Sequence, residues 1–134
     1  MPDWSIKIVQ AGGGTAFVPD LYGAKAGDPL QAQQDDLVTW NNTTDDPHQP
    51  WPTDASYQPL PDSEVPRGSA KYLSDVIPPQ GSSRPSYDVA QPDAVPPSTT
   101  KPSTWTVYYY CKLHPGVTSE RGTIVGTVPP TGDA

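Results

Sequence analysis

The chain has 134 residues, a formal net charge of −7 and a pI near 4.4. This length suits one domain with a single core. The acidic balance, without any basic cluster, argues against nucleic acid as a partner. No apolar run reaches the ~18 residues that a membrane span requires. The 19 prolines and 11 glycines favour strands joined by loops over helices.

The first third of the chain predicts short strands separated by turns. Residues 4–9 are typical of an opening strand, and the glycines at 12–14 indicate a turn or bulge. Residues 17–21 are expected to form a short buried segment. Residues 29–33 and 37–42 are predicted to form a hairpin around a turn at 34–36, with the second strand running towards His48.

A proline-rich insertion is expected at about 49–103. Thirteen of the 19 prolines lie between Pro47 and Pro102, which excludes a central strand or a long helix because proline removes ladder donors and breaks helices. We expect the insertion to wrap around the core, with strand candidates at 76–77 and 87–89 and a helical turn near 69–74. The side chains expected to pin it are Trp51, Tyr57, Leu60, Tyr72 and Leu73.

The strongest chemical signal lies between residues 104 and 128. Residues 104–111 alternate aromatic and β-branched side chains and predict a strand that ends at Cys111. His114 follows three residues later, before a Pro-Gly turn and a second predicted strand. This arrangement places a thiolate beside an imidazole at one end of a sheet. A soft sulfur ligand next to a nitrogen ligand favours copper or zinc over magnesium or calcium.

Simpler interpretations exist for each of these residues alone. A lone cysteine at a strand end is more often an inert core residue, and a lone histidine near prolines is more often a surface residue. The chain has one cysteine and two histidines in total, Cys111, His114 and His48, and all three fall at ends of predicted strands. Zinc accepts the same ligands as copper and remains open at this point.

Three segments resemble the cupredoxins, the small β-sandwich copper proteins. They are 36–42 (DLVTWNN) leading to His48, the 77–87 region, and 107–116 (VYYYCKLHPG) closing on 121–125 (RGTIV). The resemblance implies an all-β Greek-key β-sandwich of the cupredoxin type with a long Pro-rich insertion. It also implies that His48, Cys111 and His114 are the three equatorial ligands of one copper ion.

The axial position departs from the family, which usually places a methionine there, because Met1 is the only methionine. Counting forward from His114 puts Val117 at that position and leaves no axial side chain. Counting back from Gly122 puts Glu120 there, with 117–119 as an insertion. The second alignment is favoured because strand register is harder to shift than a loop.

We therefore expect a mononuclear copper protein that carries out one-electron transfer and is not an enzyme. A Cys–His nucleophile pair would need an orienting third group and an oxyanion pocket, which the pattern lacks. Two alternatives stay open: a copper-binding module for metal carriage or sensing, and a structural β domain of a larger secreted protein.

The remaining expectations concern the surroundings of this domain. Residues 1–128 are expected to form the cupredoxin-like domain, and 129–134 a tail. The resemblance implies a redox protein partner, and the acidic surface favours a basic one. We expect a monomer located in the periplasm or otherwise exported, with any leader outside the given sequence.

Overall fold

The computed structural model describes residues 3–11, 14–84, 86–90, 92, 95 and 98–130, and its regular structure there is almost entirely β. The expected all-β class is therefore confirmed. The elements are β1 (Asp3–Ala11), β2 (Gly14–Pro19), β3 (Leu30–Gln33), β4 (Leu37–Asn42), β5 (Pro50–Thr53), the 3-10 helix η1 (Asp62–Glu64), β6 (Tyr87–Asp88), β7 (Ser103–Cys111) and β8 (Arg121–Val128). Gly12, Gly13 and residues 131–134, for which a turn and a tail were predicted, lie outside the described part.

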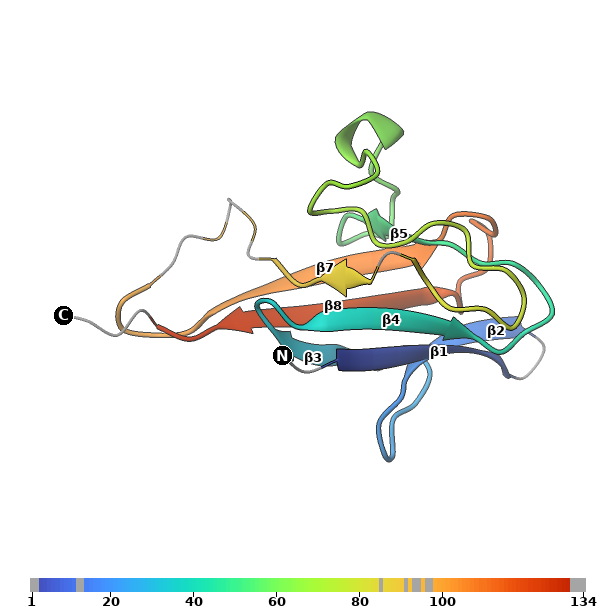
Figure 1. Ribbon diagram of the computed structural model, residues 1–134, viewed down its shortest axis with the longest axis horizontal. Coiled ribbons are helices and arrows are strands. Elements are labelled where there is room, and N and C mark those ends of the chain that lie inside the picture. Colours follow the sequence, from blue (N-terminus) through green and yellow to red (C-terminus); the bar gives the residue numbers. More distant parts are fainter. Residues whose placement is uncertain are drawn as a thin grey trace.

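The strands form two four-stranded sheets that face each other (Figure 1). The strand order is β2-β1-β4-β6 in one sheet and β3-β8-β7-β5 in the other. The chain changes sheet at every connection from β2 to β7. The pairs β1–β4 and β3–β8 are parallel, and the other neighbours are antiparallel. This is the Greek-key β-sandwich that the sequence predicted.

Alternating burial along the strands fills the space between the sheets. In β4 the residues Val38, Trp40 and Asn42 are buried, while those between them are partly exposed. Trp40 is fully buried, with its ring 5.4 Å from that of Tyr109 and 6.5 Å from that of Tyr87. Because side chains alternate between faces, the same periodicity that buries Trp40 points Asn42 into the interior at the end of the strand.

The predicted hairpin of 29–33 and 37–42 is wrong. The two strands form, as β3 and β4, but they belong to opposite sheets. The turn between them is a corner: Asp35 adopts a positive φ of 76°, and the Asp36 carboxylate accepts hydrogen bonds from the Gln33 backbone N–H (2.9 Å) and the Trp4 indole N–H (2.8 Å). These bonds hold the chain as it leaves one sheet for the other.

The first residues of the insertion form β5, an edge strand that was not among the predicted strands. Prolines are tolerated at an edge because their missing donors face away from the neighbouring strand. Trp51 and Tyr110 form a small second core with Val65, and Tyr72 packs against it. The strand expected at 87–89 is confirmed as β6, whereas 76–77 gives only a bridge between Ile77 and His48.

Two smaller expectations also change. The one helical turn of the described part is η1, at 62–64 and not near 69–74. Leu21, expected in a buried segment with Phe17, is 46% exposed, whereas Phe17 is buried. No helix among the described residues is long and apolar enough to cross a membrane.

One end of the sandwich collects the termini of strands from both sheets. β4 ends there at Asn42 and β7 ends at Cys111, while β5 begins at Pro50 and β8 at Arg121. In Figure 1 this is the right-hand end, where the connection between β7 and β8 turns back. The residues that follow or precede these strand ends are therefore the ones that can meet.

Candidate metal centre

Four side chains with metal-binding atoms gather at this end of the sandwich: His48, Cys111, His114 and Glu120. Their ligand atoms all lie within 4.8 Å of one another. The Cys111 sulfur is 3.6 Å from Nδ1 of His48 and 3.3 Å from Nδ1 of His114. Glu120 Oε1 is 3.6 Å from the first of these nitrogens and 3.0 Å from the second. The three residues of the predicted ligand set and the favoured axial candidate are thus brought together.

His48 is held by its backbone and by one nitrogen of its ring. Its backbone N–H and C=O exchange hydrogen bonds of 3.1 and 2.7 Å with Ile77, which fixes the segment after β4 against the insertion. Nε2 lies 3.0 Å from the hydroxyl of Thr44, and the ring is fully buried. Nδ1 is left facing the sulfur and the carboxylate.

The hydroxyl of Thr44 determines which nitrogen of His48 carries the proton. It lies 2.7 Å from Oδ1 of Asn42, an atom that can only accept. Having donated its single proton to Asn42, the hydroxyl accepts from Nε2–H of His48. Nδ1 is then the unprotonated nitrogen, which is the form that binds a metal.

Asn42 anchors this network and was not singled out by the sequence analysis. Its Nδ2 donates to the carbonyl of Asp46 (2.7 Å) and lies within reach of those of Pro78 (3.2 Å) and Ile77 (3.4 Å). The available signal was the alternation along β4, which places residue 42 on the same inward face as Val38 and Trp40. A polar residue at such a position needs partners inside the protein.

Cys111 ends β7 with a fully buried side chain. Its backbone N–H donates to the carbonyl of Glu120 (3.1 Å), which extends the β7–β8 ladder to this residue. Burial raises the pKa of the thiol to about 11; hydrogen bonds from the backbone at Gln49 and Leu113 oppose this rise, and the nearby charge of Glu120 adds to it. The thiol of the metal-free protein is therefore protonated at neutral pH, and a metal ion would displace the proton.

Three successive turns bring Glu120 back to the cysteine. The backbone N–H of His114 bonds to the carbonyl of Cys111, that of Val117 to His114, and that of Glu120 to Val117, over 3.2, 3.0 and 3.1 Å. Residues 117–120 thus form the last of these turns, directly before the chain enters β8 at Arg121. Val117, the other axial candidate, is 36% exposed, while Glu120 is 3% exposed.

Burial and the neighbouring charges set the protonation of His48. Its pKa is lowered, chiefly because burial disfavours the charged ring, although the Glu120 carboxylate opposes the shift. A neutral ring at neutral pH is what metal binding requires.

The separations suit a single transition-metal ion. A nitrogen at about 2.0 Å and a sulfur at about 2.3 Å from one ion, at tetrahedral to trigonal angles, lie about 3.5 to 3.7 Å apart. The observed sulfur–nitrogen separations of 3.6 and 3.3 Å are close to this. The donor set of thiolate, two imidazoles and a carboxylate matches copper or zinc and is poor for magnesium or calcium.

Gln49 and Trp51, which follow His48 closely in the sequence, connect the insertion to the sandwich. The Gln49 side chain donates to the Ser74 carbonyl (3.0 Å), and its backbone carbonyl accepts from Lys112 (2.9 Å), so it ties the insertion to the ligand loop. The Trp51 indole donates to the Leu60 carbonyl (2.9 Å) and therefore anchors the insertion, as the sequence favoured.

Comparisons with known proteins show similarity of fold and no similarity of sequence to a known family. No family model and no curated protein matches the sequence. Similar solved structures include a multicopper oxidase, 19% identical with a TM-score of 0.46 over 92% of this chain and 41% of that one. McoA, a multicopper oxidase from the hyperthermophile Aquifex aeolicus, is 13% identical with a TM-score of 0.48 over 96% of this chain and 29% of its own. The multicopper oxidase mgLAC is 18% identical with a TM-score of 0.44 over 98% and 39% of the two chains.

The two sheets and the His-Cys-His-Glu cluster have the form of a cupredoxin-like domain, as the sequence predicted, and the donor set of the cluster suits copper, as it also suits zinc. The chain spans less than half the length of these oxidases, with shares of 41%, 29% and 39%. The expectation that the chain is not an enzyme needs correction, because each of these structures is that of an oxidase.

Proposed function

We propose that His48, Cys111 and His114 bind one copper ion with Glu120 as the fourth ligand, and that the site serves one-electron transfer. The observation that carries the proposal is the convergence of these four ligand atoms within 4.8 Å at one end of the sandwich. When bound, copper would supply a Cu(II)/Cu(I) couple, since thiolate and imidazole are acceptable to both oxidation states.

The protein holds its ligands so that they move little when the charge at the site changes. Cys111 is fixed by the β7–β8 ladder and His48 by its bridge to Ile77 and its bond to Thr44. These restraints come from the β7–β8 pair and from the segments that hold Thr44 and Ile77, and together they oppose a rearrangement towards a square-planar geometry.

Electrons are proposed to pass at the exposed edge of His114. Its side chain is 32% exposed, whereas those of His48 and Glu120 are 1% and 4% exposed. Leu113 and Val117, 40% and 36% exposed, flank it and offer an apolar contact surface. A partner docking there would meet the one ligand that reaches solvent.

The surroundings of the site add further proposals. The net charge of −7 favours a basic redox partner, whose association would weaken with added salt. A monomer with one copper ion per chain, exported or periplasmic, remains our expectation.

The absorption and EPR spectra of the copper-loaded protein test the proposal. We expect an intense thiolate-to-copper charge-transfer band that is lost in Cys111→Ser. A loaded protein without this band, or a Cys111→Ser variant that keeps it, would contradict a copper–thiolate bond.

Replacing the carboxylate tests the fourth ligand. An anionic ligand favours Cu(II), so Glu120→Met is expected to raise the reduction potential and shift the spectrum. Glu64→Met, a change at an exposed position of η1, serves as the matched control and should alter neither. An unchanged spectrum in Glu120→Met would remove Glu120 from the site.

The buried carboxylate also favours a second candidate, copper carriage or sensing, because it stabilises one oxidation state over the other. Electron self-exchange separates the two functions. Fast exchange with a reversible couple supports electron transfer, whereas slow exchange with strong retention of Cu(II) supports carriage. Preferential retention of zinc over copper in a competition experiment would contradict both.

A further inference from the structure

Among the described residues, part of β7 has no neighbouring strand on one side and so lies at an open edge of its sheet. β8 pairs with the whole of β7 on one side, but β5 covers only Tyr108–Cys111 on the other. The backbone N–H of Cys111 bonds to Glu120 on the β8 side, whereas that of Lys112 bonds to Gln49 on the β5 side. Because this direction alternates along a strand, the backbone groups of Thr104 and Thr106 point to the β5 side, beyond the end of β5.

The chain blocks the equivalent groups on β5 itself. There, Trp51 and Thr53 lie opposite Tyr110 and Tyr108 and direct their backbone groups to β7. Pro50 and Pro52 occupy the outward positions, where they present no N–H to an added strand. No proline lies in β7, so Thr104 and Thr106 keep both a donor and an acceptor.

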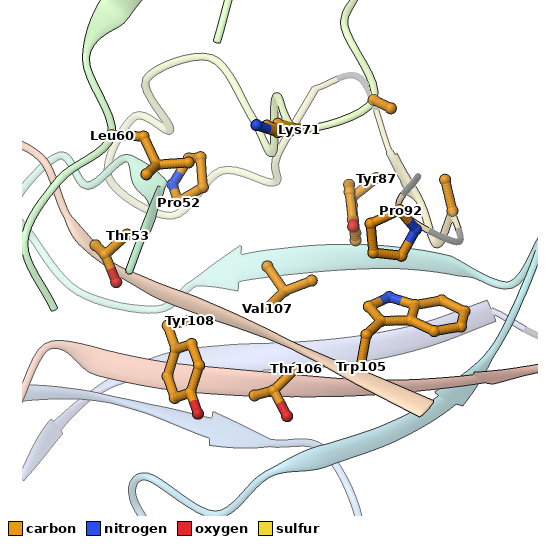
Figure 2. Close-up of a pocket in the computed structure, with 12 residues that line it drawn as sticks. Pro52, Thr53, Leu60, Lys71, Tyr87, Pro92, Trp105, Thr106, Val107 and Tyr108 are labelled. Atoms are coloured by element: carbon orange, nitrogen blue, oxygen red, sulfur yellow. The ribbon is translucent and has the colours of Figure 1, made fainter. Parts of the chain in front are cut away.

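A pocket of about 440 Å³ adjoins this open edge. It is lined by four consecutive β7 residues, Trp105–Tyr108, and by Leu60, Tyr87 and Pro92 from the insertion (Figure 2). Figure 2 shows the indole nitrogen of Trp105 on the side of its ring that faces Pro92 and Tyr87.

Two polar groups of this pocket lack partners within the described part of the chain. Trp105 is 7% exposed, yet its indole N–H has no hydrogen-bond acceptor. A buried donor of this kind requires an acceptor, and the backbone carbonyl or side-chain oxygen of a segment that enters the pocket can supply it. Lys71 lines the same pocket, and no carboxylate of the described residues pairs with its ammonium group.

We propose that the open edge of β7 beside this pocket binds an extended acidic peptide segment of a partner protein, which adds to the sheet as a strand. Its backbone pairs with Thr104 and Thr106, its apolar side chains enter the pocket, and its acidic side chain meets Lys71. The binding site is separate from the metal centre and does not depend on the proposed electron transfer.

The geometry favours a peptide over other occupants. A donor and an acceptor repeated at Thr104 and Thr106, two residues apart, match the spacing of another extended backbone. The edge adjoins residues of the insertion that line the pocket, among them Leu60, Lys71 and Tyr87, and a second copy of this chain would present the same set. Pairing of two copies edge to edge would bring Lys71 to both sides of the interface, whereas an acidic peptide supplies the carboxylate that Lys71 lacks among the described residues.

The test uses the full chain and a fluorescein-labelled, amidated peptide of sequence TVEVT. This probe combines valines at alternate positions with one glutamate. Binding is followed by fluorescence anisotropy, with a peptide of the same sequence but a fully N-methylated backbone as control. We expect saturable binding of the first and none of the second. Absence of binding, or equal binding of the two, would overturn strand pairing.

A matched pair of variants locates the site. Thr106→Pro removes an N–H that faces away from β8 and is expected to weaken binding about tenfold, whereas Thr106→Val keeps the N–H and should remain within about twofold of the unaltered protein. Equal affinity in the two variants contradicts pairing at this edge. If Thr106→Pro fails to fold, the N-methylated peptide alone decides the matter on the unaltered protein.

Charge is tested separately. Lys71→Met is expected to weaken TVEVT binding about two- to fivefold and to leave binding of TVQVT unchanged. An equal effect on both peptides would contradict the pairing of the acidic side chain with Lys71. A protein dimer that disperses in Thr106→Pro would assign the edge to a second copy and so overturn the proposal.

Discussion

Thr44 shows how a single hydroxyl prepares a ligand. Thr44→Val keeps the shape of the side chain but leaves Nε2–H of the buried His48 without its acceptor. Loss of such a partner typically lowers metal affinity about 10- to 100-fold. We expect a loss of this size in a chelator competition for copper. The control is Thr39→Val, whose hydroxyl lies 3.2 Å from that of Ser86 at an exposed position. Equal affinities in both variants would contradict the role of Thr44.

Gly126 in β8 cannot easily be replaced, because the neighbouring Trp105 leaves no room for a side chain. A Cβ on Gly126 would collide with the indole of Trp105, which lies opposite this residue on β7. Gly126→Ala is therefore expected to destabilise the fold by about 1 to 3 kcal/mol, measured by urea unfolding. Gly116→Ala, where a Cβ meets nothing within 4 Å, should stay within about 0.5 kcal/mol. Equal midpoints for the two variants would show that Trp105 moves aside at little cost.

At the scale of residues, the sequence located the cysteine and histidines of the proposed metal centre because their types are rare in this chain. Cys111, His114 and His48 could be chosen because no other cysteine or histidine competes with them. Thr44 could not be chosen in the same way, since the chain has many threonine and serine residues, and Asn42 carries no metal-binding atom type that would single it out. Their role depends on which atoms meet in space, which spacing along the chain does not reveal.

At the scale of elements, local patterns predicted strands better than their partners. β3 and β4 carry the alternation and the turn residues of a hairpin, yet each pairs with a strand remote in sequence, β8 and β1. The polar residues of the corner serve equally well in a hairpin or in a change of sheet. The choice between the two is decided by the burial of Val38 and Trp40 in the core between the sheets. Patterns within a short stretch of sequence carry no information about such long-range contacts.

A prediction at the scale of elements concerns Trp51, which joins the insertion to the sandwich. Its ring packs edge-on against Tyr72, with centroids 6.1 Å apart, and Lys112 lies over it at 3.7 Å. Trp51→Ala is expected to destabilise the protein by about 3 to 5 kcal/mol and to expose residues 54–73 to proteolysis. The control is Tyr22→Ala, whose side chain is fully exposed, and unchanged cleavage in Trp51→Ala would show that other contacts hold the insertion.

The whole molecule combines a proline-rich insertion with a regular sandwich, and only the second is easily predicted. The ends of the chain follow the cupredoxin pattern, whereas the insertion contributes β5, β6 and the Ile77 bridge through short contacts with many loops between them. Short segments of this kind carry little periodicity. Their positions are set by the side chains they meet, Trp51 and Tyr87 among them.

Buried tyrosines give the whole fold an alkaline limit. Burial is the main cause that raises the pKa of Tyr87 to about 12, from the usual value near 10. Burial likewise raises the pKa of Tyr109. Because the folded state keeps these phenols protonated while the unfolded state releases their protons, the stability they confer is fully present below pH ~10 and is lost as pH rises towards ~12.

The free energy of unfolding should therefore fall steadily above pH ~10, by about 2 to 3 kcal/mol at pH ~12 from Tyr87 alone. Urea unfolding at intervals across this window measures the slope. Tyr87→Phe removes the proton but keeps the ring against Trp40, so its slope should be shallower than that of the unaltered protein. Parallel slopes in the two proteins would mean that Tyr87 ionises as readily in the fold as in the unfolded chain, and that its burial does not govern alkaline stability.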